Sequence, residues 1–88
     1  MYTIKPTSKF KKDFKTIVKR GYDITLLQKV IEQLANARPL EVKYKDHNLG
    51  GNWIGYRECH IEPDWLLIYK IDRDMLVLTR TGTHSDLF

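Results

Sequence analysis

The sequence contains few of the residues that several common classes of protein require. Its single cysteine, Cys59, excludes an internal disulfide and any zinc site built from several cysteines. No run of about 18 apolar residues is present, so no helix is predicted to cross a bilayer. The N-terminal segment also lacks the apolar stretch of a signal peptide. These absences predict a cytoplasmic protein.

Length and composition predict one small globular domain over residues 1–88. Hydrophobic residues make up 42% of the chain and include two Trp, five Tyr and three Phe, which is enough for a core. A core of this size is thin, and its stability is expected to be modest. The sequence shows no repeat, low-complexity tract or linker that would divide it.

Positive charge is concentrated in the first segment of the chain. The net charge of the whole chain is +4, but the first twenty residues hold seven basic residues against Asp13 alone, a local net charge of +6. Such a stripe suits a nucleic-acid backbone, ribosomal RNA or an acidic protein. A solvated helix face explains it equally well. The basic residues are Lys5, Lys9, Lys11, Lys12, Lys15, Lys19 and Arg20.

Two helices are predicted after a short opening strand. In TIKPTSKFKKDFKTIVKRG, apolar residues recur at helical spacing, Thr7 or Ser8 can cap the helix, and Gly21 ends it. A second helix is predicted to begin after Asp23, with an apolar stripe formed by Ile24, Leu27, Ile31 and Leu34. Helices joined so closely form a hairpin.

The second half of the chain predicts a sheet. Residues 40–54 have no sustained period and contain a Gly-Gly pair, which predicts a long loop. Three strand candidates follow at residues 56–61, 65–71 and 75–81, separated by the turn sequences EPD and DRD. The order strand, helix, helix, strand, strand, strand predicts an α+β fold, in which the helix hairpin packs on one face of an antiparallel sheet.

The three histidines are the first candidates for chemistry. His60 lies near the end of the first of these three strands and His84 follows the last, so both are expected at the same end of the sheet. His47 can join them only if the long loop folds back over the sheet. Asp64 lies across a tight turn from His60, which predicts a pair in which the carboxylate fixes the imidazole tautomer for acid or base catalysis.

Each candidate also has a purely structural interpretation. A lone histidine is often a surface or satisfied core residue, Arg80 can extend to the sheet edge instead of binding phosphate, and Trp65 can fill the core instead of stacking on a base. Metal binding is a further alternative. The histidines are 13 and 24 residues apart, which fits no compact zinc motif, so we expect no metal ligand set.

Two segments carry a resemblance to a known family. The stretches YKDHNLGGNWIGYRECHIEPDWLLIYK and RTGTHSDLF closely resemble the YafQ-like toxins, a branch of the RelE superfamily of bacterial toxin-antitoxin endoribonucleases. The shared pattern is KDH, L-x-G-x-W, YR-x-x-H-x-EPDW and R-x-G-x-H-x-x-LF. Family members often have Pro after KDH, where this chain has Asn48.

The resemblance implies a RelE-like fold and a small ribonuclease without cofactors. Such an enzyme cuts messenger RNA on the translating ribosome and is silenced by a cognate antitoxin. The resemblance places the catalytic residues at His47, His60, Asp64 and His84, and it places Arg80 and Phe88 at the substrate-binding positions. We also expect Trp65 and Lys45 to bind substrate, Trp65 by stacking on an unpaired base.

Metal-free RNA cleavage needs a base, an acid and a cation, and these residues can supply all three. We expect His84 to be the acid and His60, oriented by Asp64, to be the base, while His47 binds phosphate or shares the base role. Arg80 would stabilise charge on the phosphate, and Phe88 would anchor the C-terminal segment or stack on a base. The alternative is a catalytically inactive RelE-fold module that binds an antitoxin or ribosomal RNA through the basic first helix.

Overall fold

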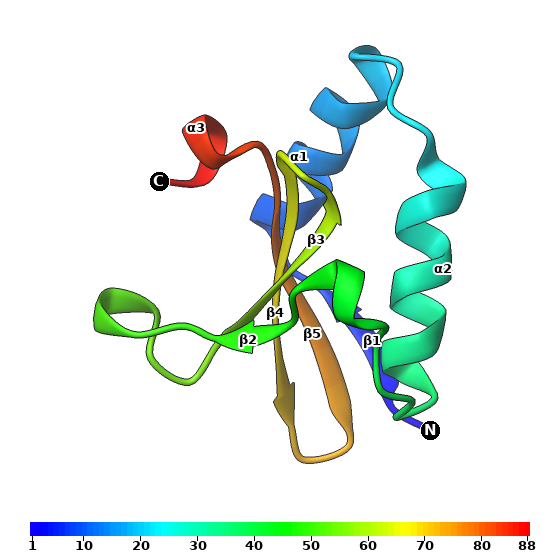
Figure 1. Cartoon of the computed structure of the whole chain (residues 1–88), viewed down its shortest axis with the longest axis vertical. Coiled ribbons are helices and arrows are strands. Elements are labelled where there is room, and N and C mark those ends of the chain that lie inside the picture. The colour runs from blue at the N-terminus through cyan, green and yellow to red at the C-terminus, as the bar shows by residue number, and fades with distance from the viewer.

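The structure, a computed structural model, describes residues 1–88 as a five-stranded sheet with helices (Figure 1). None of the helices is long and apolar enough to cross a membrane. In chain order the elements are β1 (Thr3–Pro6), α1 (Ser8–Lys19), α2 (Ile24–Ala35), the 3-10 turn η1 (Val42–Tyr44), β2 (His47–Asn48), the 3-10 turn η2 (Gly51–Trp53), β3 (Arg57–Glu62), β4 (Trp65–Asp72), β5 (Met75–Gly82) and α3 (His84–Leu87).

Both predicted helices form, and their predicted caps are present. The Thr7 hydroxyl accepts a hydrogen bond from the Phe10 N–H at 3.0 Å at the start of α1. The Asp23 carboxylate accepts one from the Thr25 N–H at 3.0 Å at the start of α2. Gly21, at φ 79°, makes the turn between the helices in a left-handed conformation that favours glycine. The two helices therefore follow each other closely, as predicted.

The sheet has the order β1-β5-β4-β3-β2, and it is mixed. Strands β2, β3, β4 and β5 are antiparallel neighbours, whereas β1 pairs parallel with β5, with Thr3 opposite Met75. The α+β class is confirmed, but the expectation of a wholly antiparallel sheet is wrong at β1. Hairpin turns fix the direction of β3, β4 and β5, whereas the helix pair and three strands separate β1 from its partner β5, so no turn sequence determines the direction of β1.

The segment expected to be an irregular loop contains the short strand β2. This strand pairs antiparallel with β3, with His47 opposite Glu58. The Leu49 N–H also donates to the Tyr56 carbonyl at 2.9 Å. The segment therefore folds back along the sheet, which is the condition for His47 to approach the other histidines.

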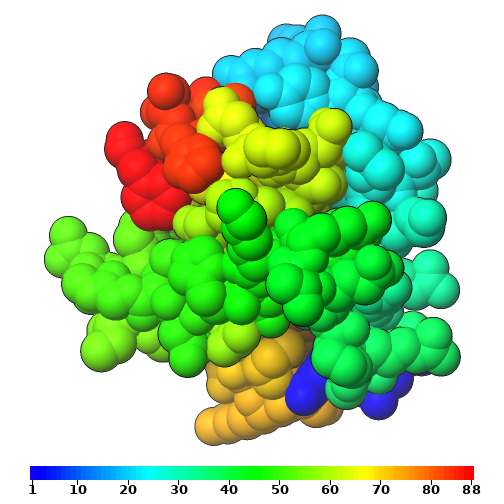
Figure 2. All heavy atoms as spheres, in the orientation of Figure 1, coloured from blue at the N-terminus to red at the C-terminus, as the bar shows by residue number.

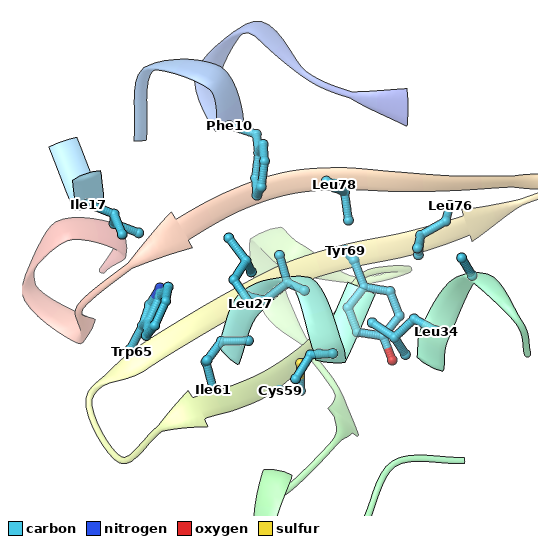
Figure 3. Packing of buried hydrophobic residues seen from close by; sticks show 13 residues of the cluster. Phe10, Ile17, Leu27, Leu34, Cys59, Ile61, Trp65, Tyr69, Leu76 and Leu78 are labelled. Carbon is cyan, nitrogen blue, oxygen red and sulfur yellow. The ribbon is translucent and has the colours of Figure 1, made fainter. Parts of the chain in front are cut away.

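The main core lies between the two long helices and one face of the sheet (Figure 3). Side chains on a strand alternate between the two faces, and Trp65, Leu67 and Tyr69 of β4 point to the helix side. Trp65 is 1% exposed, and its Nε1 donates to the Thr81 Oγ1 at 3.0 Å. The expected substrate-binding role of Trp65 is therefore wrong, because RNA cannot reach a side chain buried under the helices.

A second, smaller cluster lies on the opposite face of the sheet. Leu66 and Ile68 of β4 are fully buried there against Leu87 of α3, with partly buried side chains from the β2–β3 region around them. The C-terminal segment is thus anchored by Leu87. Phe88 is 61% exposed and contacts Trp53 edge-on, with ring centres 6.3 Å apart.

We expect Leu67→Ala to lower the free energy of unfolding by about 2–5 kcal/mol, since it leaves a cavity in a fully packed core. Urea denaturation followed by circular dichroism measures this change. Val42→Ala is the matched control, because Val42 is 93% exposed and its truncation should change stability by less than about 0.5 kcal/mol. Equal effects of the two substitutions would contradict the placement of the core.

Candidate active site

Three histidines gather on the sheet face that the long helices leave open. His47 comes from β2, His60 from β3 and His84 from the start of α3. The ring centres of His47 and His60 are 6.4 Å apart, and those of His60 and His84 are 5.7 Å apart. In Figure 2 the C-terminal residues (red) lie against the β3–β4 turn (yellow-green) above the green β2 region. The expected meeting of His60 and His84 is confirmed, and His47 joins them.

Asp64 pairs with His84 and not with His60. Its Oδ1 accepts a hydrogen bond from the His84 backbone N–H at 3.0 Å and lies 2.5 Å from the His84 Nδ1. The expected His60–Asp64 pair is therefore wrong, because the strand register shifts between His60 and Glu62 and the following turn directs Asp64 toward α3. The backbone and then the side-chain hydrogen bond from His84 lower the pKa of Asp64, which keeps this carboxylate ionised.

Backbone carbonyl groups fix the tautomers of the other two histidines. The His60 Nδ1 lies 3.2 Å from the Pro63 carbonyl oxygen, and the His47 Nδ1 lies 2.6 Å from that of Lys45. A carbonyl oxygen only accepts hydrogen bonds, so each Nδ1 carries the hydrogen and each neutral ring has its lone pair on Nε2. Both histidines therefore offer Nε2 for proton exchange.

Glu58, which was not predicted as a site residue, lies between these two Nε2 atoms. Its Oε1 is 3.4 Å from the His60 Nε2 and 3.7 Å from the His47 Nε2, and the residue is 5% exposed. Strand periodicity could have found it, because Glu58 and His60 are two residues apart on β3 and so share one face. Glu58 thus gives the two imidazoles a common carboxylate partner.

The C-terminal segment is held in place by Asp86. Its carboxylate accepts two hydrogen bonds from Arg20, at 2.6 and 3.0 Å, and one from the Thr83 N–H at 2.9 Å. Thr83 in turn caps α3 by accepting from the Asp86 N–H at 3.1 Å. A Cβ on Gly82 would lie 2.8 Å from the Asp86 Oδ2, so only glycine leaves room for this carboxylate. His84, the first residue of α3, is positioned by this arrangement.

Arg80, the expected phosphate-binding cation, is engaged by α1. Its Nε and Nη2 donate to the Asp13 carboxylate at 2.7 and 3.1 Å, and Asp13 also accepts from the Thr81 N–H at 3.2 Å. The Arg80 Nη1 makes no hydrogen bond within the chain, so the guanidinium keeps donors for a ligand. The Asp13 hydrogen bonds raise the pKa of Arg80, which is charged in any case.

A further network supports the segment that carries His47. The Asp46 carboxylate accepts hydrogen bonds from the Tyr69 hydroxyl at 2.6 Å and from Arg57 at 3.0 Å. Arg57 also donates to the Asn48 Oδ1 at 2.7 Å, so Asn48 is fixed although family members often have Pro there. Lys45, expected to bind substrate, has an exposed side chain and a left-handed backbone at φ 49°. Its carbonyl oxygen orients His47, as described above.

One group of side chains has the geometry to hold a cation. The potential ligand atoms of Glu58, His60 and His84 all lie within 4.8 Å of one another, and imidazole with carboxylate suits zinc or copper. The expectation of no metal ligand set rested on the histidine spacings and overlooked Glu58. The only cysteine takes no part, because burial raises the pKa of the Cys59 thiol and removes it from solvent.

Comparison with known proteins finds relatives over nearly the whole chain. A sequence model of the family described as "Bacterial toxin of type II toxin-antitoxin system, YafQ" matches residues 2–88. The chain is 45% identical over 86 residues to the mRNA interferase toxin YafQ of Escherichia coli strain K12, covering 97% of this chain and 94% of that protein. A chain in the crystal structure of the E. coli DinJ-YafQ toxin-antitoxin complex is similar at a TM-score of 0.90, with 44% identity and coverage of 99% and 97%. The metal-bound toxin from Helicobacter pylori has a TM-score of 0.94, with 50% identity and full coverage of both chains.

Asp86→Asn should destabilise the protein in a pH-dependent manner. The Arg20 hydrogen bonds, and then that of the Thr83 N–H, hold the pKa of Asp86 far below its ordinary value. The carboxylate therefore stabilises the fold above the unfolded-state pKa of about 3.9, and this contribution is lost as the pH falls below that value. Urea denaturation of both proteins between pH 7 and pH 2 should show a difference in stability that shrinks below about pH 4.

Asp72→Asn is the matched control, since Asp72 is exposed and its carboxylate makes no hydrogen bond or ion pair within the chain. It should lack this pH dependence. A constant difference between wild type and Asp86→Asn over the whole pH range would show that the Asp86 charge does not hold the C-terminal segment.

Proposed function

This chain belongs to the YafQ family of bacterial toxins from type II toxin-antitoxin systems, and on that premise we propose that it is an mRNA interferase that cuts messenger RNA on the translating ribosome without a metal. The observation that carries the proposal is the convergence of His47, His60 and His84 with two carboxylates on one open face of the sheet. A surface built only for binding has no need of three imidazoles at such distances.

The reaction that these groups fit is transesterification by the neighbouring ribose. The 2′-OH gives up its proton and its oxygen attacks phosphorus, the bond from phosphorus to the 5′-oxygen breaks, and that oxygen takes up a proton. The products are a 2′,3′-cyclic phosphate and a 5′-OH end. A base, an acid and a group that stabilises charge on the phosphate are sufficient, and each positioned acid or base contributes about 10²- to 10⁴-fold.

His84 is the proposed general acid. Asp64 accepts from its Nδ1, so the carboxylate stabilises the imidazolium form and leaves the Nε2–H directed away from the pair. The ring is also 53% exposed, so its Nε2 is open to a substrate. The Asp64 partnership thus supports the acid role for His84 and not the base role for His60.

His60 is the proposed general base, with Glu58 as its carboxylate partner in place of Asp64. Its Nδ1–H donates to the Pro63 carbonyl, so the neutral ring carries its lone pair on Nε2, the atom proposed to take the 2′-OH proton. Glu58 lies 3.4 Å from that nitrogen and stabilises the protonated ring. His47 shares the same carboxylate and is proposed to bind the phosphate or to assist as base.

Positive groups at the edge of the sheet and on α1, which covers the other face, suit an RNA backbone. The free Nη1 of Arg80 can donate to a phosphate oxygen, and the lysines of α1 are exposed. Phe88 is exposed and able to stack on a base. These features are consistent with substrate held on a ribosome in the cytoplasm, where the lysines would meet ribosomal RNA.

We further propose that a cognate antitoxin silences the toxin. The YafQ of E. coli is seen in a complex with DinJ, and this chain matches a chain of that complex over 99% of its length. An antitoxin that covers the histidine face or displaces α3 would stop cleavage without unfolding the toxin. A catalytically inactive module that only binds antitoxin or ribosomal RNA is the competing function.

His84→Ala should reduce cleavage by about 10²- to 10⁴-fold with an unchanged melting temperature. The measurement is end-group analysis of messenger RNA incubated with translating ribosomes, at EDTA concentrations that leave ribosomes intact. Wild type should produce 2′,3′-cyclic or 3′-phosphate ends. Ser85→Ala, the exposed neighbour on α3, is the matched control and should cleave like wild type.

Two outcomes of this experiment would contradict the proposal. Absence of cleavage by well-folded wild type would favour the inactive binding module. Cleavage abolished by EDTA and restored by zinc or copper would give the Glu58, His60 and His84 group a metal-binding role, as the metal-bound H. pylori relative suggests. A metal there would occupy the nitrogen lone pairs that proton transfer requires.

Asp64→Asn should lower kcat by about 10- to 100-fold while leaving KM nearly unchanged, because the amide cannot stabilise the charged form of His84. Single-turnover cleavage at saturating enzyme isolates this step. Asp64→Glu should retain part of the rate that Asp64→Asn loses. Asp72→Asn, at the far end of β4, is the matched control and should cleave at the wild-type rate. A rise in KM with an unchanged kcat in Asp64→Asn would instead assign the carboxylate to substrate binding.

A further inference from the structure

A cavity beside the histidine face is not used by the mechanism proposed above. It has a volume of about 450 Å³, which lies within the range of small-ligand sites. It opens between the first turn of α2, η1 and the end of β3. Its lining residues are Leu26, Lys43, Tyr44, Lys45, His60, Ile61, Glu62 and Pro63.

The cavity exists because β2 begins only at His47. This strand pairs with β3 only at Arg57 and Glu58, and the chain before His47 turns into η1 through the left-handed Lys45. The outer edge of β3 from His60 to Glu62 is therefore left without a strand partner. In an antiparallel sheet, alternate peptide groups of such an edge point outward, where they can donate and accept hydrogen bonds.

The walls of the cavity combine flat apolar surfaces with two lysines, Lys43 and Lys45, against one exposed carboxylate, Glu62. Tyr44 and Pro63 provide rings, and Leu26 adds an aliphatic surface. The Lys43 Nζ lies 5.2 Å from the centre of the Tyr44 ring, close enough for a cation–π contact, and Lys45 is exposed at the rim. A ligand that matches these walls is planar, carries hydrogen-bonding edges and is attached to negative charge.

His60 belongs both to the cavity and to the histidine cluster. Its ring approaches Glu58 on the catalytic side, while its Nδ1 is bound to the Pro63 carbonyl on the cavity side. A phosphate placed between His60 and His84 would thus have one of its two flanking nucleotides directly at the mouth of the cavity.

We propose that this cavity binds the base of one nucleotide that flanks the scissile phosphate, and that it contributes to the choice of cleavage site. The base stacks on Tyr44, its edge meets the open peptide groups of β3, and the lysines at the rim contact the adjoining phosphates. This inference rests on the proposed ribonuclease activity and adds a subsite to it.

The test combines a protein variant whose cavity is filled with RNA substrates that lack one base. Leu26→Trp fills the cavity, and the RNAs are a parent sequence and two versions with an abasic ribose on the 5′ or the 3′ side of the cleaved phosphate, each presented on ribosomes. Wild type should lose about tenfold or more in kcat/KM on one abasic RNA, as expected for the loss of one stacked base. Leu26→Trp should show a similar loss on the parent RNA and little further loss on that abasic RNA.

Two other variants complete the experiment. Gln28→Trp, two residues away on the exposed side of α2 and outside the cavity, should behave as wild type on all three RNAs. Tyr44→Leu removes the ring without filling the space and should reproduce the non-additive pattern of Leu26→Trp, which separates base binding from any misfolding caused by the larger side chain.

The outcomes distinguish this inference from the function on which it rests. If Leu26→Trp and Tyr44→Leu cleave the parent RNA as wild type does, or if their losses multiply fully with the abasic loss, the base is not in this cavity and the inference is overturned while the ribonuclease activity stands. If well-folded wild type cleaves none of the RNAs, the proposed function fails, and the subsite fails with it.

Discussion

The position of His84 depends on the carboxylate of Asp86. This group binds Arg20 at the end of α1 and the N–H of Thr83 at the start of α3, so it joins two segments that lie 66 residues apart in the chain. The short helix α3 has only one turn and could not persist alone. It is stabilised by this carboxylate, by its capping box and by the burial of Leu87 against β4. The geometry of the site is thus a property of the folded whole and not of any local motif.

One face of the sheet forms the core, and the other face carries the histidine cluster. On one face the helices cover Trp65, Leu67 and Tyr69, and this packing provides most of the hydrophobic stabilisation. On the other face, Glu58 and His60 of β3 alternate with Cys59 and Ile61, which belong to the helix-side core. Because a strand reverses its side chains at every residue, the same segment anchors the fold and carries the reactive groups. A shift of one residue in the β3–β4 register would bury the histidine and expose Cys59.

The sequence predicted the parts of this protein that depend on local pattern. Helix caps at Thr7 and Asp23, the hairpin turns and the convergence of His60 with His84 follow from spacing and strand direction, and all are present. It could not predict contacts between side chains that the folding of distant segments brings together. Asp64 is directed toward His84 by a register shift between β3 and β4 that no residue type in the sequence indicates. Trp65 is buried because it lies on the face of β4 that the helices cover. Glu58 was not predicted, although period-two alternation along β3 places it on the same face as His60.

The attachment of α3 by a few exposed contacts has a consequence for how the protein loses activity. Arg20 and Asp86 are partly exposed, with 38% and 29% of their side-chain surface accessible, and only Leu87 of this helix is buried. The segment is therefore less costly to open than the helix-side core, which needs global unfolding. The opening of α3 and the global unfolding of the chain are then two separate equilibria. On warming, the population of molecules with His84 in place would decline before the core unfolds. The protein would then be folded but inactive, and it would regain its activity when α3 docks again.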